Sequence, residues 1–140
     1  MKTTNANTSV APAIGRILMA TIFVFSGIGK IFNPAATIGY IQSSGLPFAT
    51  LGLAVAIAVE LGGGTMLALG LKTRWVAGVL AMFSIVTGLA FHSAIGDQNQ
   101  LIHLLKNIAM AGGLLQVVAF GAGAYSLDNG SVRKHAGQLA

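Results

Sequence analysis

Few side chains in this sequence could do chemistry, and most of them lie inside long apolar runs. Glu60 is the most isolated, about twelve residues from either end of the run 48–71 and so about 18 Å from each end of a helix. An ionisable residue inside a bilayer costs about 2.5 to 3.5 kcal/mol, so it needs a partner or a water-filled site. Gly52, Ala56 and Gly64 share its face at a spacing of four, which predicts that Glu60 faces the interior of a helix bundle.

The sequence predicts Lys106 as the partner of Glu60, because it too lies in an apolar run and a buried Glu/Lys ion pair would neutralise both charges. Such a pair could be structural, or it could be the basis of a ligand or proton site. We favour the second role, since ionisable groups inside a membrane are functional by default. Glu60 and Lys106 are therefore the predicted catalytic residues.

Four further polar side chains are predicted to bind a ligand near one end of the bundle: Lys30, His92, His103 and Asn107. His103 and Asn107 share a helical face with Lys106, because spacings of three and four bring side chains together. The alternative roles stay open, since Lys30 could extend to the lipid headgroups and the two histidines could lie at the interface.

The same side chains exclude several chemistries. The sequence has no cysteine and no further carboxylate cluster, so we expect no metal site. A haem would need two imidazoles that face each other at similar depth, and His92 with His103 could supply them, so haem is kept as a minor alternative. No nucleophile and base are spaced as in a hydrolase, and the glycines lie inside apolar runs rather than in a dinucleotide-binding loop.

Composition places these residues in a membrane protein. Hydrophobic residues make up 54% of the 140 residues and charged residues 8%, whereas a soluble domain has about 25% charged residues. The net charge of +5 comes from scattered lysines and arginines rather than a basic face, so no nucleic-acid partner is expected. The lipid bilayer is the expected environment.

Four apolar segments are long enough to cross a bilayer as helices, at about 13–32, 48–71, 74–95 and 101–124. The second has no polar face of the kind that a soluble helix needs. The sequence therefore predicts an all-α integral membrane protein, a four-helix transmembrane bundle in one domain over residues 13–125. Residues 1–12 and 126–140 are predicted to be mobile.

Lysine and arginine in the short flanks predict the orientation of this bundle. They gather at the amino end, in the link between the second and third segments, and in the carboxyl-terminal tail. Both termini are therefore expected to be cytoplasmic.

Several motifs follow one another along the chain: Gly15-Arg16-Ile17-Leu18, Phe25-Ser26-Gly27-Ile28-Gly29-Lys30, Ser44-Gly45-Leu46-Pro47, Glu60-Leu61-Gly62-Gly63-Gly64, Gly70-Leu71-Lys72-Thr73-Arg74, His103 with Leu105-Lys106-Asn107, and Gly121-Ala122-Gly123-Ala124-Tyr125-Ser126-Leu127-Asp128. Their order over about residues 14–128 resembles the DoxX family of bacterial membrane proteins. The family's recurrent positions correspond to Arg16, Lys30, Glu60, Lys106 and Asn107.

The resemblance implies a multi-pass protein of the bacterial inner membrane. Some members of the family are linked to quinone-coupled sulfur oxidation, where a DoxD-type subunit belongs to a thiosulfate:quinone oxidoreductase. Others are linked to a membrane-associated oxidative-stress complex with partner enzymes. We therefore expect a membrane subunit of a quinone-linked redox complex, with quinone as ligand and a soluble redox protein or further copies of the chain as partners. The alternative is a non-catalytic scaffold or small transporter whose Glu/Lys pair is structural.

Overall fold

The computed structural model describes residues 10–130 and is built from helices, with no strand in that range. Within it, four helical spans are long and apolar enough to cross a membrane, at Ala11–Phe32, Ala49–Leu69, Thr73–Phe91 and Gln98–Phe120. Their 19 to 23 residues match the roughly 20 that a bilayer core about 30 Å thick requires. The prediction of an all-α four-helix transmembrane bundle is confirmed.

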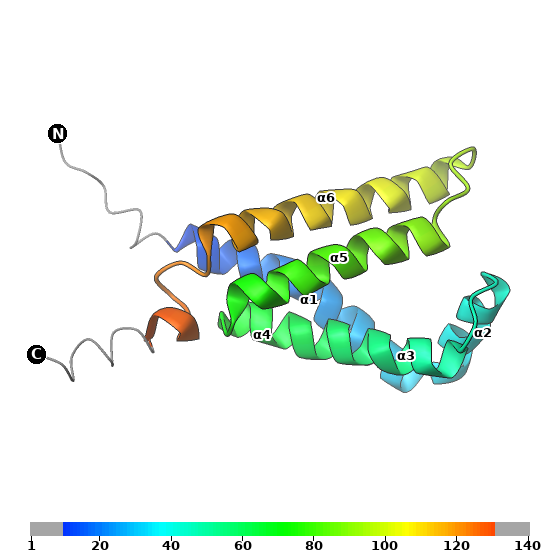
Figure 1. The fold of residues 1–140 in the computed structure, drawn as a ribbon, viewed down its shortest axis with the longest axis horizontal. Helices are drawn as coiled ribbons and strands as arrows, with labels where there is room; N and C mark the ends of the chain where they lie inside the picture. The colour runs from blue at the N-terminus through cyan, green and yellow to red at the C-terminus, as the bar shows by residue number, and fades with distance from the viewer. Residues whose placement is uncertain (1–9, 131–140) are drawn as a thin grey trace, which may run out of the picture.

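The first span is helix α1 (Ala11–Phe32), and the third and fourth are α5 (Thr73–Phe91) and α6 (Gln98–Phe120). The second is divided into α3 (Ala49–Ile57), the π-helical segment η2 (Ala58–Gly63) and α4 (Gly64–Leu69). Both ends of the described chain lie at one end of the bundle, which we call the terminal end, and the α5–α6 loop lies at the distal end (Figure 1).

An additional short helix, α2 (Pro34–Ser43), lies at the distal end, where the sequence analysis expected only a connection. Pro34 explains both the end of α1 and the start of α2. A proline cannot continue α1, which ends at Phe32, but its fixed φ and missing N–H suit the first position of a new helix. In Figure 1, α2 runs across the ends of α1 and α3 rather than along the bundle.

The predicted boundaries of the last two spans change for local reasons. α5 ends at Phe91 rather than Ile95. α6 begins at Gln98, because the Asp97 side chain accepts a hydrogen bond of 3.0 Å from the Gln100 backbone N–H and caps the helix. It ends at Phe120, where Gly121 has a φ of 83° that favours glycine.

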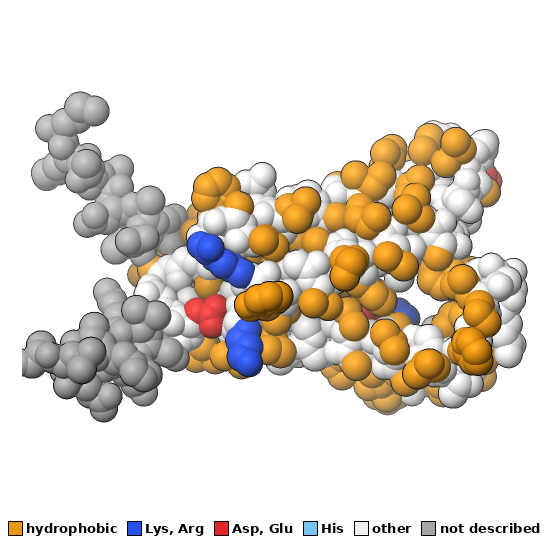
Figure 2. Space-filling model, viewed as in Figure 1, with side chains coloured by type: hydrophobic (Ala, Val, Ile, Leu, Met, Phe, Trp, Pro, Cys, Tyr) orange, Lys and Arg blue, Asp and Glu red, His pale blue; other side chains and the backbone are white. Residues whose placement is uncertain are grey.

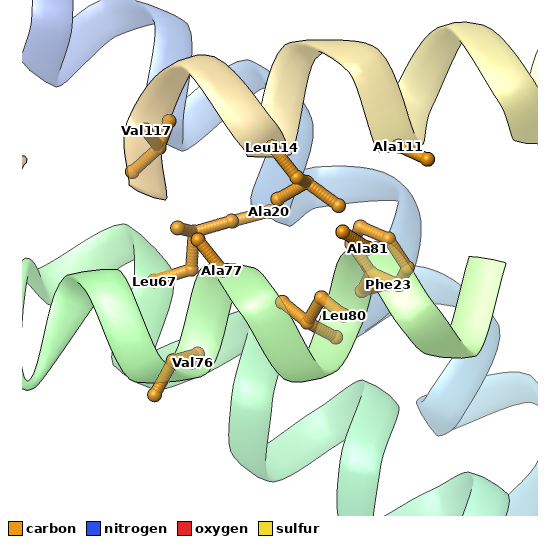
Figure 3. Close-up of a cluster of buried hydrophobic side chains, with 10 residues drawn as sticks. All are labelled: Ala20, Phe23, Leu67, Val76, Ala77, Leu80, Ala81, Ala111, Leu114 and Val117. Atoms are coloured by element: carbon orange, nitrogen blue, oxygen red, sulfur yellow. The ribbon is translucent and has the colours of Figure 1, made fainter. Parts of the chain in front are cut away.

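The apolar core lies in the terminal half of the bundle and joins all four spans. Figure 3 shows this cluster, to which α4 contributes Leu67, α5 Leu80 and α6 Leu114, with Ala20 and Phe23 from α1. The three leucines are fully buried. This core fixes the helices at the terminal end and leaves the distal half free to diverge.

Glycines bring α1 against the second span at backbone distance. A Cβ added to Gly27 would lie 3.0 Å from the Leu61 backbone nitrogen, and one added to Gly64 would lie 3.1 Å from Phe23 Cβ. Small residues allow transmembrane helices to approach this closely. The contact sets the rotation of α1 relative to η2, and so decides which side chains of the two helices meet.

A polar clamp closes the terminal end. Arg16, 1% exposed, donates hydrogen bonds to the carbonyl oxygens of Leu67 (2.8 Å), Ala68 (3.1 Å) and Tyr125 (2.6 Å). The first two carbonyls belong to the last turn of α4, which has no further helical turn to satisfy them. Arg16 therefore ties α1 to the end of α4 and to the chain that follows α6.

Asp128 completes this clamp at the start of α5. Its carboxylate accepts hydrogen bonds from the backbone N–H groups of Lys72 (2.7 Å) and Thr73 (2.9 Å) and from the Thr73 hydroxyl (2.6 Å). Partial burial raises the pKa of Asp128. These hydrogen bonds and the nearby Arg16 charge lower the pKa by more than burial raises it, so it lies below its ordinary value.

The sequence predicted a mobile tail from residue 126. In the structure, residues 126–130 instead pack on the bundle. Residues 131–140, and residues 1–9 of the predicted amino-terminal segment, lie outside the described residues.

Candidate ligand cavity with a buried ion pair

Glu60 lies in the π-helical segment η2, near the middle of the second span. It is nine residues before Leu69 and eleven after Ala49, so roughly 14 Å and 17 Å from the two ends. The following Gly62 and Gly63 carry no side chain that would resist the wider turn, and single π turns occur often at functional sites. The prediction that Glu60 is buried inside the bundle is confirmed, since the residue is 7% exposed.

The ammonium group that pairs with Glu60 belongs to Lys30 of α1. Lys30 Nζ lies 2.8 Å from Glu60 Oε2 and donates a hydrogen bond of 2.7 Å to Ser26 Oγ. Ser26 in turn donates to Glu60 Oε1 at 3.2 Å. The three side chains form a closed polar cluster, which the close packing at Gly27 places between α1 and η2.

The predicted Glu60/Lys106 pair is therefore wrong. Lys106 is exposed on α6, and α1 rather than α6 packs against η2. Lys30 does not extend to the distal surface either, because its side chain turns inward to Ser26 and Glu60 and is 22% exposed.

Glu60 Oε2 is held by the ion pair and is shielded from solvent. Lys30 Nζ lies 2.8 Å from this oxygen, and no other donor within residues 10–130 reaches it. A buried carboxylate is costly unless an opposite charge pairs with it, and Lys30 supplies that charge. The Glu60 side chain is 9% exposed, so more than nine-tenths of it is shielded from solvent.

A cavity of about 650 Å³ opens next to the ion pair in the distal half of the bundle. Its walls are mainly apolar side chains of α3 and α5, with α2 and the 44–48 loop at the distal end. Lys30, Glu60 and Asn107 are the polar groups that α1, η2 and α6 contribute. The volume falls in the range of about 300 to 1,000 Å³ that is typical of small-molecule sites.

The cavity exists because α5 diverges from α3. α5 packs against η2, α4 and α6 but makes little contact with α3. Figure 2 shows this gap as a hollow between the two arms of the molecule, with charged side-chain atoms visible at its inner end. Lining residues such as Leu51, Val55 and Val86 are among the exposed apolar side chains of the spans. The hollow therefore opens sideways, toward the lipid.

The distal end of the cavity is closed by an aromatic pair. Tyr40 of α2 stacks on Phe91 of α5 with ring centroids 5.1 Å apart, and both rings line the cavity. Ile41, Ala49 and Leu53 pack behind them to hold α2 on α3.

His92 and His103 meet beside this closure, but only His92 lines the cavity. Their rings stack with centroids 4.9 Å apart, and His92 Nδ1 shares a hydrogen bond of 2.8 Å with Gln100 Oε1. Two stacked imidazoles present their faces to each other, whereas a haem iron needs two nitrogens pointing at one centre.

Of the predicted site residues, the structure thus brings Lys30, Glu60, His92 and Asn107 to one cavity, with His103 at its edge, and leaves Lys106 outside. Asn107 packs against Gly88, where an added Cβ would lie 2.8 Å from its own Cβ. Tyr40 and Phe91 were missed, although Pro34 at the start of α2 was a signal that a helix carries Tyr40 there.

This fold and site define an integral membrane protein of the multi-pass helical class, with a polar cluster at the base of a lipid-facing cavity. Residues 11–93 match the DoxX family, so the chain belongs to that family.

Two relatives from Escherichia coli (strain K12) are similar over most of their length. Inner membrane protein YqjF is 36% identical over 119 residues, which cover 85% of this chain and 90% of that protein. Inner membrane protein YphA is 30% identical over 122 residues, which cover 82% of this chain and 86% of that protein. No solved structure matches.

Proposed function

We propose that this protein is the membrane subunit of a quinone-linked redox or oxidative-stress complex and that it binds the quinone ring in the cavity beside Lys30 and Glu60. The observation that carries the proposal is an apolar cavity of about 650 Å³ that opens to lipid and ends at a buried ion pair. A quinone is a flat apolar ring with polar atoms at its edge and a tail that stays in the bilayer, which matches these surroundings.

The polar cluster supplies what such a ring needs at its inner edge. Lys30 can donate a hydrogen bond to a carbonyl oxygen, and Glu60 is the one carboxylate that lines the cavity. Quinone reduction consumes protons, and a carboxylate beside an ammonium group is suited to pass them on. The electrons would come from a soluble partner protein. His92 and Asn107 contribute polar atoms on the α5 and α6 side.

The location follows from the relatives, both of which are inner membrane proteins. We place this protein in the bacterial inner membrane with both termini on the cytoplasmic side. Exposed Lys72 and Arg74 at the terminal end support this orientation, because positively charged flanks favour the cytoplasm.

One observation favours the alternative of a scaffold or small transporter. The Lys30–Glu60 pair lies where α1 and η2 approach at backbone distance, so it also contributes to helix packing. In that role the cavity would be incidental. A variant that fills the cavity and leaves both residues of the pair in place separates the two functions.

Ala56→Leu is that variant, because Ala56 is buried and lines the cavity on the helix that leads to Glu60. Ala54→Leu on the same helix is the matched control, since Ala54 is exposed outside the cavity. We expect protein purified from membranes to carry quinone that solvent extraction and mass spectrometry identify. Ala56→Leu should lose most of it and remain folded, while Ala54→Leu keeps it. Equal quinone content in both variants would contradict the proposal.

A further inference from the structure

Two exposed cations and an exposed indole lie together at the terminal end of the bundle, where α4 is followed by α5. They are Lys72, Arg74 and Trp75, which we call the terminal patch. We propose that the terminal patch binds the headgroup of an anionic phospholipid, with the two cations on its phosphate and the indole against its glycerol and upper acyl chains. This site is separate from the cavity and does not depend on what the cavity binds.

The positive charge of the terminal patch has no counter-charge of its own. Among residues 10–130, Asp128 is the one carboxylate at this end of the bundle. Its oxygens already accept three hydrogen bonds, from the backbone of Lys72 and Thr73 and from the Thr73 hydroxyl. Within the part of the chain that the structure describes, no salt bridge or hydrogen bond engages the side chains of Lys72 and Arg74. Both cations are therefore available to an anion from outside the chain.

The fold places the two cations close to each other. Lys72 has a φ of 45°, and Asp128 holds its backbone N–H. The Arg74 side chain bends over the carboxyl end of α6, where a Cβ added to Gly121 would lie 3.3 Å from Arg74 Nε and 3.5 Å from Nη2. Figure 2 shows basic side chains close to an acidic one at the terminal end. Because Asp128 already caps the start of α5, the proposed site consists of side chains and not of the helix end.

The position of Trp75 favours a lipid over an acidic protein as the partner. Trp75 is the third residue of the span Thr73–Phe91 and is 82% exposed. An exposed tryptophan at the end of a span lies at the level of the lipid headgroups, because its ring is apolar and its N–H is polar. Lys72 and Arg74 lie within three residues of it along the chain, so they reach the same depth. The anions at that depth are lipid phosphates.

The expected preference follows from the two charges. A lysine or arginine near an anionic membrane surface strengthens binding by about fivefold. The planar guanidinium of Arg74 also matches the oxygens of a phosphate group. The nearby Asp128 carboxylate offsets part of the attraction. We therefore expect an anionic lipid to bind the terminal patch about tenfold to thirtyfold more tightly than a zwitterionic lipid with the same acyl chains.

The test uses the intrinsic fluorescence of Trp75, the only tryptophan in the sequence, so the signal comes from this site alone. The full-length protein is reconstituted in phosphatidylcholine vesicles that contain a small fraction of brominated phosphatidylglycerol or of brominated phosphatidylcholine. Bromine quenches an indole that it contacts, so titration of each lipid gives its relative binding constant beside Trp75. The brominated phosphatidylglycerol should bind about tenfold or more tightly at low salt, and the difference should decrease at about 0.5 M salt.

The double variant Lys72→Gln/Arg74→Gln should reduce the preference to within about threefold, because both cations are lost. Lys106→Gln is the matched control, since it removes an exposed lysine of α6 outside the terminal patch and should leave the preference intact. A preference that persists in the double variant would overturn the proposal. If the double variant does not fold, the comparison of the two lipids in the unaltered protein still decides.

Two further outcomes would identify a different partner. Equal quenching by the two lipids in the unaltered protein would overturn the proposal and leave the terminal patch to an acidic protein. Glycerol phosphate carries the same phosphate chemistry without acyl chains, so at millimolar concentration it should not relieve the quenching by brominated phosphatidylglycerol. Relief of the quenching would show that a soluble phosphate ester is the ligand, which would also overturn the proposal.

Discussion

Removal of the Lys30 ammonium group tests the pairing on which the site depends. Replacing one partner of a buried ion pair costs about 3 to 5 kcal/mol, because the other charge stays buried without compensation. Lys30 is 22% exposed and Glu60 9%, so we expect Lys30→Met to cost less than this range, about 2 to 3 kcal/mol. Ser26 still donates to Glu60, which limits the loss.

The assay is a double-mutant cycle on the free energy of unfolding, measured by denaturing-detergent titration in mixed micelles. We expect Glu60→Gln to weaken the effect of Lys30→Met, so that the two changes together cost less than their sum by about 1 to 3 kcal/mol. Lys106→Met is the control and should be within about 0.5 kcal/mol of the unaltered protein, because its side chain is exposed. Coupling of Glu60 to Lys106 and not to Lys30 would refute the pairing.

Two further predictions concern the packing that positions this pair. Gly27→Val should destabilise the bundle by about 1 to 3 kcal/mol or more, because the valine side chain would push α1 away from Leu61. Gly29→Ala is the control and should not destabilise it, because Gly29 faces open space. Equal thermal denaturation of the two variants would count against the close approach. The Asp128 clamp should stabilise the protein at neutral pH, because folding lowers the pKa of this carboxyl below its ordinary value of 3.8. This stabilisation should be lost as the pH falls from 3.8 through the lower pKa of the folded state. Asp128→Asn should reduce the melting temperature at pH 7 and flatten this acid dependence, and an unchanged acid limb would show that other groups cause it.

The spans were predictable because a bilayer imposes both length and apolarity on a helix, and Ala11–Phe32 or Gln98–Phe120 satisfy both without reference to any partner. The burial of Glu60 followed from the same rule, since a carboxylate at the middle of a span has no route to water. These properties belong to single segments and can be read locally.

The partner of Glu60 was not predictable in this way, because it depends on how one helix is rotated against another. Lys30 and Lys106 are both lysines in apolar spans, and what separates them is the contact of Gly27 with Leu61. The clamp at Asp128 was missed for a related reason. Asp128 lies among polar residues near the end of the sequence, as the residues of a mobile tail do. Only the fold brings the N-terminus of α5 beside Asp128.

The proposed function places a quinone-type ring in the cavity between α3 and α5, beside the Lys30–Glu60 pair. The most direct measurement is photo-crosslinking in native membranes with a quinone analogue that carries a photoreactive group on its ring, followed by peptide mapping. We predict labels on cavity residues such as Val55, Phe83 and Val86, suppressed by Ala56→Leu. Labels spread over the outer face of α6, at Leu105 or Ile108, with none in the cavity, would contradict the account.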